Sequence, residues 1–223
     1  MCGRFTRMYT WRELWELYAL SPGNAASNLQ PRFNICPTTT IDAVIEQDGK
    51  RVYQPMRWGL VPGWWKKSLK ELRLATFNAR AETVAEKPFF RSSFKRKRCL
   101  IPASGYYEWH TTPEGKQPYY FTRRDGHIIT IAGLWDEWKN PETNKPLQSC
   151  TMIIGAANKF VSQIHERMPI ILKPDQFEPW LSGKAGLEIL KPAAERVLQK
   201  HQVSKRVNSS RTNGDDATLI EPV

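Results

Sequence analysis

The stretch Gln117–Trp138, QPYYFTRRDGHIITIAGLWDEW, favours β-structure. Aromatic and β-branched residues are frequent in both of its halves, and the Asp125-Gly126 pair between them is a strong turn signal. The pattern therefore predicts a β-hairpin that turns at this pair. Residues 41–62, IDAVIEQDGKRVYQPMRWGLVP, predict another two strands around an Asp48-Gly49 turn.

Further strands are predicted outside these two stretches. Residues 98–110, RCLIPASGYYEWH, contain an apolar run typical of a strand, and residues 148–158, QSCTMIIGAAN, predict a further buried strand. The tail, residues 208–223, is predicted to be a loop that ends with an apolar patch at Leu219 and Ile220.

Helices are predicted at three places. The first has apolar side chains at helical spacing after a capping-box pattern of Thr10 and Glu13, and the letters SPGN end it. The second begins near Pro174 and ends before Gly183, and the third is broken at Pro192. These segments are residues 10–20, 174–183 and 185–200. Strands and helices together predict a fold of the α/β class, α+β in type, with an antiparallel sheet core and peripheral helices.

Length and composition predict a single domain over residues 1–223 with a real core, because 40% of the residues are hydrophobic and no long linker interrupts the chain. No apolar stretch approaches the about 20 residues of a membrane span, and no signal peptide is predicted, since polar and charged residues interrupt the first twenty. The cysteines are far apart and form no CxxC pair, which predicts neither a metal site nor a disulfide framework. We therefore expect a reducing, cytoplasmic setting, with Cys99 and Cys150 as inert core thiols. Nothing in the sequence demands more than a monomer, so a monomer is the expected state.

The net charge of +11 favours a polyanionic partner, and nucleic acid is the usual one. Basic residues recur beside aromatic ones in GWWKK (63–67) and FFRSSFKRKR (89–98). Such alternation suits a single strand, whose phosphates and unstacked bases are both exposed. The alternative is a basic surface that only keeps the protein soluble, and Lys95–Arg98 fits a solvated face as well as a DNA contact.

A cysteine follows the initiator methionine in MCGRF (1–5). Removal of Met1, which the small second residue permits, would leave Cys2 with a free α-amine and a thiol on adjacent carbons. The amine titrates near about 7.7–8.0 and the thiol near about 8.5, so both are partly nucleophilic at neutral pH. The alternative interpretation is that a cysteine stands here by chance.

The chain resembles the SOS response-associated peptidase (SRAP) family, whose members shield abasic sites in single-stranded DNA. The resemblance rests on a series of motifs in family order over essentially the whole chain: MCGRF, RFNICPTT, RWGLVPGWW, FNARAET, RCLIPASGYYEW, IHERMPIIL, QVSKRVN and LIEPV. It implies a barrel-like antiparallel sheet and an N-terminal cysteine that faces a DNA groove. It also implies a stable covalent bond between that cysteine and the aldehyde of the abasic sugar, without metal or cofactor.

The chemistry of an aminothiol suits this role. The α-amine condenses with the aldehyde to an imine, and the nearby thiol adds to the imine carbon and closes a five-membered thiazolidine ring. An internal lysine would stop at the imine, which hydrolyses or undergoes strand-cleaving β-elimination. Gly3 lets the chain approach the sugar without a side-chain clash. The sequence thus predicts a self-crosslinking protein with lyase-type imine chemistry.

Three further residues match the family's catalytic positions. Glu108, among aromatic neighbours, is expected to have a raised pKa and to transfer protons, unless it is an outward-facing strand residue. The resemblance places His165 beside the sugar hydroxyl, where it can assist ring opening; a lone histidine is otherwise more often a core or surface residue. Asn78 can hold the cysteine amine or the sugar oxygen, and its alternative role is a turn or cap.

The expected DNA contacts are arginines and aromatic residues. Arg80 and Arg167 each stand two residues after a catalytic candidate, on the same face of an extended chain, and a guanidinium binds phosphate through two nitrogens. Trp65 and Pro37 match positions that wedge against the bases beside the lesion, although most tryptophans are core residues. The complete set of DNA-binding candidates is Arg4, Pro37, Trp64, Trp65, Arg80, Trp109 and Arg167.

Two other functions stay open from the sequence. Class II glutamine amidotransferases also begin Met-Cys-Gly, which allows an N-terminal-nucleophile amidohydrolase, and the family name implies a peptidase limited to the protein's own N-terminus. A single-stranded nucleic-acid-binding module without chemistry would leave Cys2 and Glu108 idle. The expected partner in the main interpretation is single-stranded DNA with abasic sites, at replication forks or single/double-strand junctions, where the protein would be associated with the nucleoid.

Overall fold

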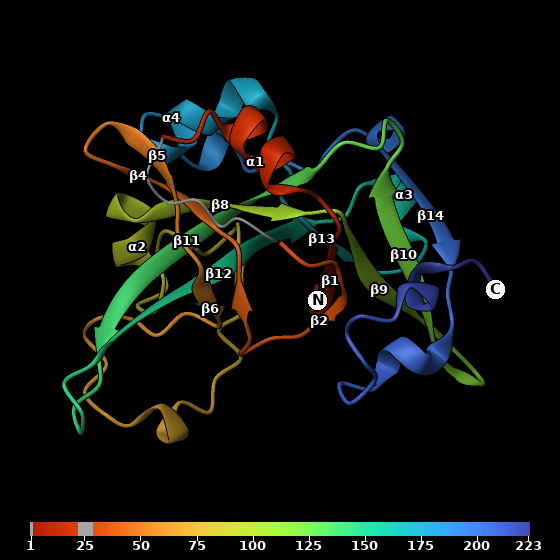
Figure 1. Cartoon of the computed structure of the whole chain (residues 1–223), viewed down its shortest axis with the longest axis horizontal. Coiled ribbons are helices and arrows are strands. Elements are labelled where there is room, and N and C mark those ends of the chain that lie inside the picture. The colour runs from red at the N-terminus through yellow and green to blue at the C-terminus, as the bar shows by residue number, and fades with distance from the viewer. Residues whose placement is uncertain (1, 22–28) are drawn as a thin grey trace.

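A computed structural model describes residues 2–21 and 29–223 and contains two β-sheets with helices around them (Figure 1). The smaller sheet has five strands in the order β14-β10-β9-β1-β2, and all neighbouring strands are antiparallel. Its strands are β1 (Phe5–Arg7), β2 (Arg32–Ile35), β9 (Gly105–Thr112), β10 (Gly115–Arg123) and β14 (Leu198–Gln202).

The larger sheet has nine strands, of which seven follow the order β3-β6-β12-β11-β8-β4-β5. Strands β7 and β13 pair with β12 near its carboxyl end, and β6 and β7 run parallel to β12. The strands are β3 (Thr40–Ile41), β4 (Val44–Gln47), β5 (Lys50–Tyr53), β6 (Met56–Trp58), β7 (Asn78–Arg80), β8 (Arg98–Ala103), β11 (Ile129–Lys139), β12 (Pro146–Ala156) and β13 (Arg167–Pro169).

The helices are short and lie outside the sheets (Figure 1). Helices α1 and α4 lie together, with the rings of Tyr18 and Phe177 5.4 Å apart. In the described part of the chain, no helix is long and apolar enough to cross a membrane. The α-helices are α1 (Trp11–Tyr18), α2 (Arg91–Arg96), α3 (Lys159–Ser162) and α4 (Phe177–Leu181), and the 3₁₀ turns are Leu69–Glu71, Pro174–Gln176, Leu187–Ile189, Glu195–Val197, Lys205–Asn208 and Ala217–Ile220.

The main core is formed by side chains from both sheets, and β1 lies where the two sheets meet (Figure 1). Phe5 in β1 is paired with Ile35 on one side and Tyr106 on the other, and its ring meets the buried Trp58 at 5.2 Å. A second cluster lies under α1 and α4, and a third lies between the five-stranded sheet and the C-terminal segment. This packing carries the start of the chain into the core.

The predicted fold class is confirmed: the chain is a mixed α/β protein with curled, mostly antiparallel sheets and peripheral helices. The hairpin predicted at Asp48-Gly49 is also confirmed, because β4 and β5 pair from Gln47 and Lys50 outward. Asp48 and Gly49 have φ values of 52° and 71°, which are the positive values that a type I′ turn requires.

The hairpin predicted at Asp125-Gly126 is wrong. The chain does turn at Gly126, which has a φ of 75°, but β10 pairs with β9 and β14, whereas β11 pairs with β8 and β12. Both strands are bonded along both edges, so each already has two partners in its own sheet. The turn therefore transfers the chain from one sheet to the other.

Two further predictions need correction. Residues 98–110 form two strands, β8 and β9, and the second begins at Gly105, where a side chain would collide with the Tyr120 ring. The predicted broken helix at 185–200 consists of two 3₁₀ turns, and β14 begins at Leu198 and pairs with β10. Pairing with a distant strand outweighs the local helical preference of these last residues.

The other helix predictions are confirmed. Thr10 and Glu13 form the capping box of α1, although Trp15 on the expected apolar face is 44% exposed. The helix ends at Ala19, whose φ is 48°, before the SPGN letters, of which residues 22–24 lie outside the described residues. The helix at 174–183 begins with a 3₁₀ turn at Pro174 and ends before Gly183, which has a φ of 80°.

Candidate functional site

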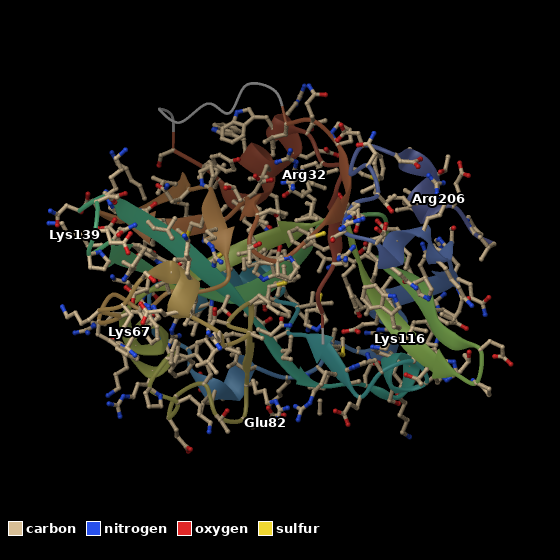
Figure 2. All side chains as sticks on the ribbon, turned by 90° about the horizontal axis from the view of Figure 1, so that it is seen from below. Arg32, Lys67, Glu82, Lys116, Lys139 and Arg206 are labelled. Carbon is tan, nitrogen blue, oxygen red and sulfur yellow. The ribbon has the colours of Figure 1, made fainter. Side chains whose placement is uncertain are left out.

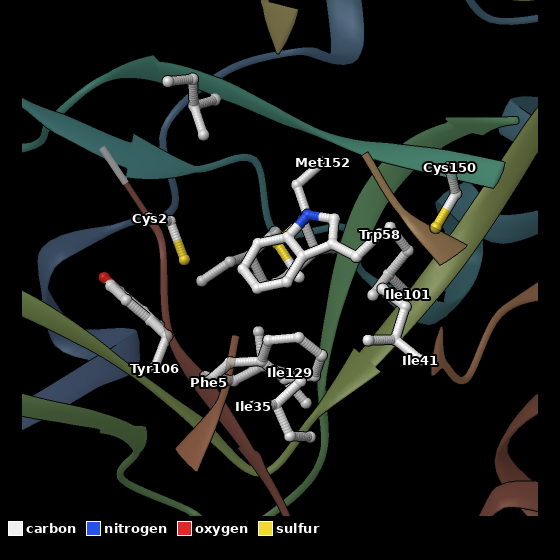
Figure 3. Packing of buried hydrophobic residues seen from close by; sticks show 14 of the residues in the cluster. Cys2, Phe5, Ile35, Ile41, Trp58, Ile101, Tyr106, Ile129, Cys150 and Met152 are labelled. Atoms are coloured by element: carbon white, nitrogen blue, oxygen red, sulfur yellow. The ribbon is translucent and has the colours of Figure 1, made fainter. Parts of the chain in front are cut away.

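Cys2 is completely buried in the full-length chain and belongs to the core cluster between the sheets (Figure 3). Burial, and secondly the charge of Glu108, raises the pKa of its thiol far above the ordinary value. The sequence suggested an accessible thiol with an ordinary pKa. The thiol is buried because Phe5 in β1 pairs with a strand on each side, which places the residues just before it in the core as well.

Asn78 stands at the first position of β7 and holds the start of the chain. Its side-chain Nδ2 donates a hydrogen bond to the carbonyl oxygen of Cys2 at 2.8 Å. Strand β7 pairs with β12 in parallel, with Asn78 opposite Met152. The structure thus brings two of the predicted catalytic residues into direct contact, and the turn or cap role for Asn78 does not apply.

Glu108 lies on β9 and is 1% exposed, so it is not an outward-facing strand residue. Burial raises the pKa of its carboxyl to about 7. In a strand, residues two apart share a face, so Glu108 lies on the same side of β9 as Tyr106, toward the main core. A carboxyl group with this pKa can both donate and accept a proton near neutral pH.

His165 lies between α3 and β13 and is half-buried. Its Nδ1 accepts a hydrogen bond from the backbone N–H of Arg167 at 3.0 Å, which places the proton of the neutral ring on Nε2. Burial lowers the pKa of His165, so the neutral form dominates at pH 7. This arrangement fixes the ring at the end of β12, where β13 pairs with it.

Arg80 and Arg167 lie on strands that flank the same end of β12. Arg80 is paired with Ile154 and is exposed, whereas Arg167 is paired with Ala156. The Nη1 atom of Arg167 lies 2.5 Å from Oε1 of Glu82, which lies at the surface of the molecule (Figure 2). The structure therefore places both predicted phosphate ligands at the carboxyl end of β12.

Arg4 and Trp109 are engaged elsewhere. Nη1 of Arg4 donates to Oδ1 of Asn34 at 2.6 Å and to the carbonyl oxygen of Val207 at 2.8 Å. Trp109 lies on the face of β9 opposite to Glu108, and its Nε1 donates to Oδ1 of Asn208 at 2.6 Å. Both side chains bind the C-terminal segment to the smaller sheet, whereas the backbone N–H of Arg4 lies against the Cys2 thiol and that of Trp109 against the Glu108 carboxyl.

The predicted aromatic contacts form a cluster at the surface. Trp64 is 46% exposed, and the ring of Phe89 lies 5.3 Å from that of Trp64 and 6.0 Å from that of Trp65. A pocket of about 560 Å³ runs from Asn78 and Arg80 to Phe89. A larger pocket of about 880 Å³, between residues 171–176 and 188–197, is lined by none of the candidate residues. Pro37 is half-buried in the segment between β2 and β3.

The four residues of the basic run Lys95–Arg98 differ in exposure and in contacts. Lys95 and Arg96 are exposed, and Nζ of Lys97 pairs with Asp136 at 2.6 Å. Arg98 is buried, and its guanidinium lies over the ring of Phe94 at 4.7 Å and over that of Trp180 at 4.4 Å. The run is therefore partly a structural anchor, which the sequence pattern alone does not reveal.

Two residues at the site were missed by the sequence analysis. Glu82 was quoted only as a letter of FNARAET, yet it is the ion-pair partner of Arg167. Tyr106 was quoted only as a letter of RCLIPASGYYEW, yet its side chain packs in the same core cluster as Cys2. Neither role has a sequence signal, because both depend on contacts between segments that are distant in the chain.

The family model described as "SOS response associated peptidase (SRAP)" matches residues 1–210. This chain belongs to the SRAP family. It is 34% identical over 227 residues to the abasic site processing protein YoqW of Bacillus subtilis, with 99% of each chain covered. It is 30% identical over 233 residues to the abasic site processing protein YedK of Escherichia coli, with both chains covered completely.

The match to a vertebrate relative covers only part of the length of that relative. The abasic site processing protein HMCES of Gallus gallus is 34% identical over 198 residues, which cover 76% of this chain and 58% of that protein. Among solved structures, a protein from Bacteroides thetaiotaomicron matches with a TM-score of 0.89 and complete coverage of both chains. Its sequence identity of 24% supports the shared fold and nothing more.

Proposed function

We propose that this protein processes abasic sites in single-stranded DNA by a covalent crosslink through the α-amine and thiol of Cys2, after Met1 is removed. The observation that carries the proposal is the placement of Cys2 in the core, held by Asn78 and accompanied by Glu108, whose pKa is about 7. The relatives named abasic site processing proteins support the substrate class.

The reaction needs no external oxidant or reductant. The amine nitrogen attacks the aldehyde carbon of the ring-opened sugar, and the resulting carbinolamine loses water to give an imine. The thiol sulfur then adds to the imine carbon, the thiol proton passes to the nitrogen, and a thiazolidine results. Glu108 accepts and returns protons during these steps, and neutral His165 can assist opening of the sugar ring.

The DNA strand would be bound at the carboxyl end of β12, where β7 and β13 flank that strand. Arg80 and Arg167 supply guanidinium groups for the backbone phosphates. The rings of Trp64, Trp65 and Phe89 supply stacking surfaces for the bases beside the lesion. Pro37 would wedge against a flanking base. Unpaired bases near replication forks or single/double-strand junctions would meet these requirements.

The alternative of amide hydrolysis by a cysteine thiolate has less support. Only the first three residues, Met-Cys-Gly, favour it, and the net charge of +11 does not suit a small neutral amide substrate. Removal of the protein's own Met1, which exposes the amine, is compatible with the crosslinking role. The proposed activity resides in one domain over residues 1–223 and in a monomer.

The test is a mixture of the protein with a single-stranded oligonucleotide that carries one abasic site, followed by denaturing electrophoresis. We expect a denaturation-resistant adduct with this strand and none with the intact strand. Cys2→Ala should abolish the stable adduct. An undiminished yield of stable adduct from this variant would overturn the proposal.

A further inference from the structure

Tyr106 has a buried hydroxyl group with no protein partner in the described part of the chain. The side chain is completely buried, and its ring stacks on that of Phe121, with centroids 5.0 Å apart and planes at 7°. A phenylalanine would pack in the same way without burying a polar atom. Buried hydroxyl groups are normally hydrogen-bonded, so the presence of this one calls for an explanation.

The other buried tyrosines show how unusual this is. Tyr107, the next residue, donates to the carbonyl oxygen of Phe33 at 2.7 Å, and the hydroxyl groups of Tyr120 and Thr6 are 2.7 Å apart. The remaining buried tyrosines, Tyr9, Tyr18 and Tyr53, are paired as well. Tyr106 is therefore the exception among the described buried tyrosines, and it stands in the strand that carries Glu108.

The position of Tyr106 relates it to the reacting group of the proposed function. Tyr106 is paired with Phe5 in β1, three residues after Cys2, and shares the inward face of β9 with Glu108. Figure 3 shows the tyrosine ring beside Cys2 at the edge of the core cluster. Burial, followed by the charges of Cys2 and Glu108, keeps the pKa of Tyr106 well above its ordinary value, so the hydroxyl remains a donor.

Asn78, which contacts Cys2, also has a buried polar atom that no described residue hydrogen-bonds. Nδ2 of Asn78 holds the carbonyl oxygen of Cys2, while Oδ1 of the same amide is buried without a protein partner in the described residues. One donor and one acceptor are thus available around the start of β1. A substrate that brings both an acceptor oxygen and an N–H group would satisfy the two atoms together, and the carbinolamine has both.

We propose that Tyr106 is a further catalytic residue of the crosslinking reaction, whose hydroxyl donates a hydrogen bond to the aldehyde-derived oxygen of the carbinolamine. This inference rests on the proposed function. When the carbon–oxygen bond breaks, the electron pair goes to that oxygen, which takes a proton from Glu108 and leaves as water. Tyr106 stabilises the developing negative charge and keeps its own proton, and Oδ1 of Asn78 accepts from the nitrogen.

The test compares Tyr106→Phe with Tyr107→Phe under single-turnover conditions on an abasic oligonucleotide. One lost hydrogen bond of average strength corresponds to about a tenfold change in rate. We expect Tyr106→Phe to slow both stable adduct formation and borohydride-trapped imine formation about tenfold or more. Its melting temperature and its affinity for the intact strand should not fall, because the hydroxyl makes no hydrogen bond to any of the described residues.

The matched control should show the opposite pattern. Tyr107→Phe loses the bond to Phe33 and should melt at a lower temperature while it crosslinks at the wild-type rate. An unchanged crosslinking rate in Tyr106→Phe would overturn the inference, as would a lower melting temperature or a slowed thiazolidine step after normal imine formation. If the wild-type protein itself forms no adduct, the proposed function fails, and this outcome is distinct from a failure of Tyr106 alone.

Discussion

The side-chain amide of Asn78 donates a hydrogen bond to the carbonyl oxygen of Cys2, with 2.8 Å between nitrogen and oxygen. Asn78 begins β7 in the larger sheet, whereas Cys2 leads into β1 of the smaller sheet. The bond therefore joins the two sheets and fixes the reactive residue relative to Arg80, which is two residues further along β7.

Asn78→Ala should place Cys2 less accurately while leaving the strand intact. Because small displacements of reacting groups reduce rates strongly, we expect crosslink formation to slow about 10- to 100-fold. Affinity for an intact single strand should stay close to wild type. Single-turnover gels and binding titrations measure the two quantities. Asn140→Ala, in the surface turn between β11 and β12, is the control. Equal crosslinking rates for the two variants would show that Asn78 has no role in placing Cys2.

Glu108 should make the full-length protein less stable as the pH rises. Its folded pKa of about 7 exceeds the ordinary value of 4.5, so the folded state retains a proton that the unfolded chain loses. Stability from this group is complete below about pH 4.5 and declines until about pH 7. Glu108→Gln cannot ionise and does not lose this stability. The difference between its free energy of unfolding and that of the wild type should therefore rise by about 3 kcal/mol from about pH 4.5 to about pH 7.

Chemical denaturation at several pH values measures this difference, on protein that mass spectrometry shows to retain Met1. Glu46→Gln removes an exposed carboxylate in β4 and should follow the wild-type pH dependence. A constant difference between Glu108→Gln and wild type over the whole range would show that the carboxyl group titrates normally.

Glu82→Gln should tighten binding to single-stranded DNA. Glu82 occupies Arg167 through the ion pair at 2.5 Å and places a negative charge where phosphates are proposed to lie. Because the pair is partly exposed, we expect a modest gain of about two- to fivefold at low salt that fades at high salt. Fluorescence anisotropy with a labelled strand measures the affinity.

The control for this prediction breaks a comparable ion pair elsewhere. Glu178 on α4 pairs with Lys184 at the surface, so Glu178→Gln changes the net charge by the same amount. If both variants tighten binding equally, the effect belongs to net charge and Glu82 has no specific role at Arg167.

Arg80→Ala and Arg167→Ala should each weaken binding to every single-stranded sequence tested. A lost phosphate contact lowers the slope of the logarithm of the binding constant against the logarithm of salt by about 0.7 on single strands. Titrations at four salt concentrations give the slope. Arg12→Ala removes an exposed arginine of α1 and should leave the slope unchanged. Wild-type slopes in both Arg80→Ala and Arg167→Ala would show that the DNA strand binds elsewhere on the protein.

The sequence predicted features that depend on neighbouring residues better than features that depend on distant ones. The β4–β5 hairpin follows from Asp48-Gly49, whose positive φ values are a local property. The β10–β11 hairpin was wrong because the choice of strand partners is not local, and β14 was missed because its ladder with β10 outweighs helical preference. The family motifs supplied Asn78 and Glu108, whereas the unpaired hydroxyl of Tyr106 became visible only in the packed structure.

The central claim is that the reactive group is the aminothiol at the very start of the chain. The most direct measurement inserts one alanine between Met1 and Cys2 and compares adducts with abasic single-stranded DNA after denaturation. Removal of methionine then exposes the alanine amine, while the cysteine nitrogen becomes an amide that cannot form an imine. Mass spectrometry of both proteins confirms which residue is exposed. We predict that the inserted variant binds the strand and gives at most a labile imine, trapped only by borohydride. A hydrolysis-resistant adduct in wild-type yield would contradict the account.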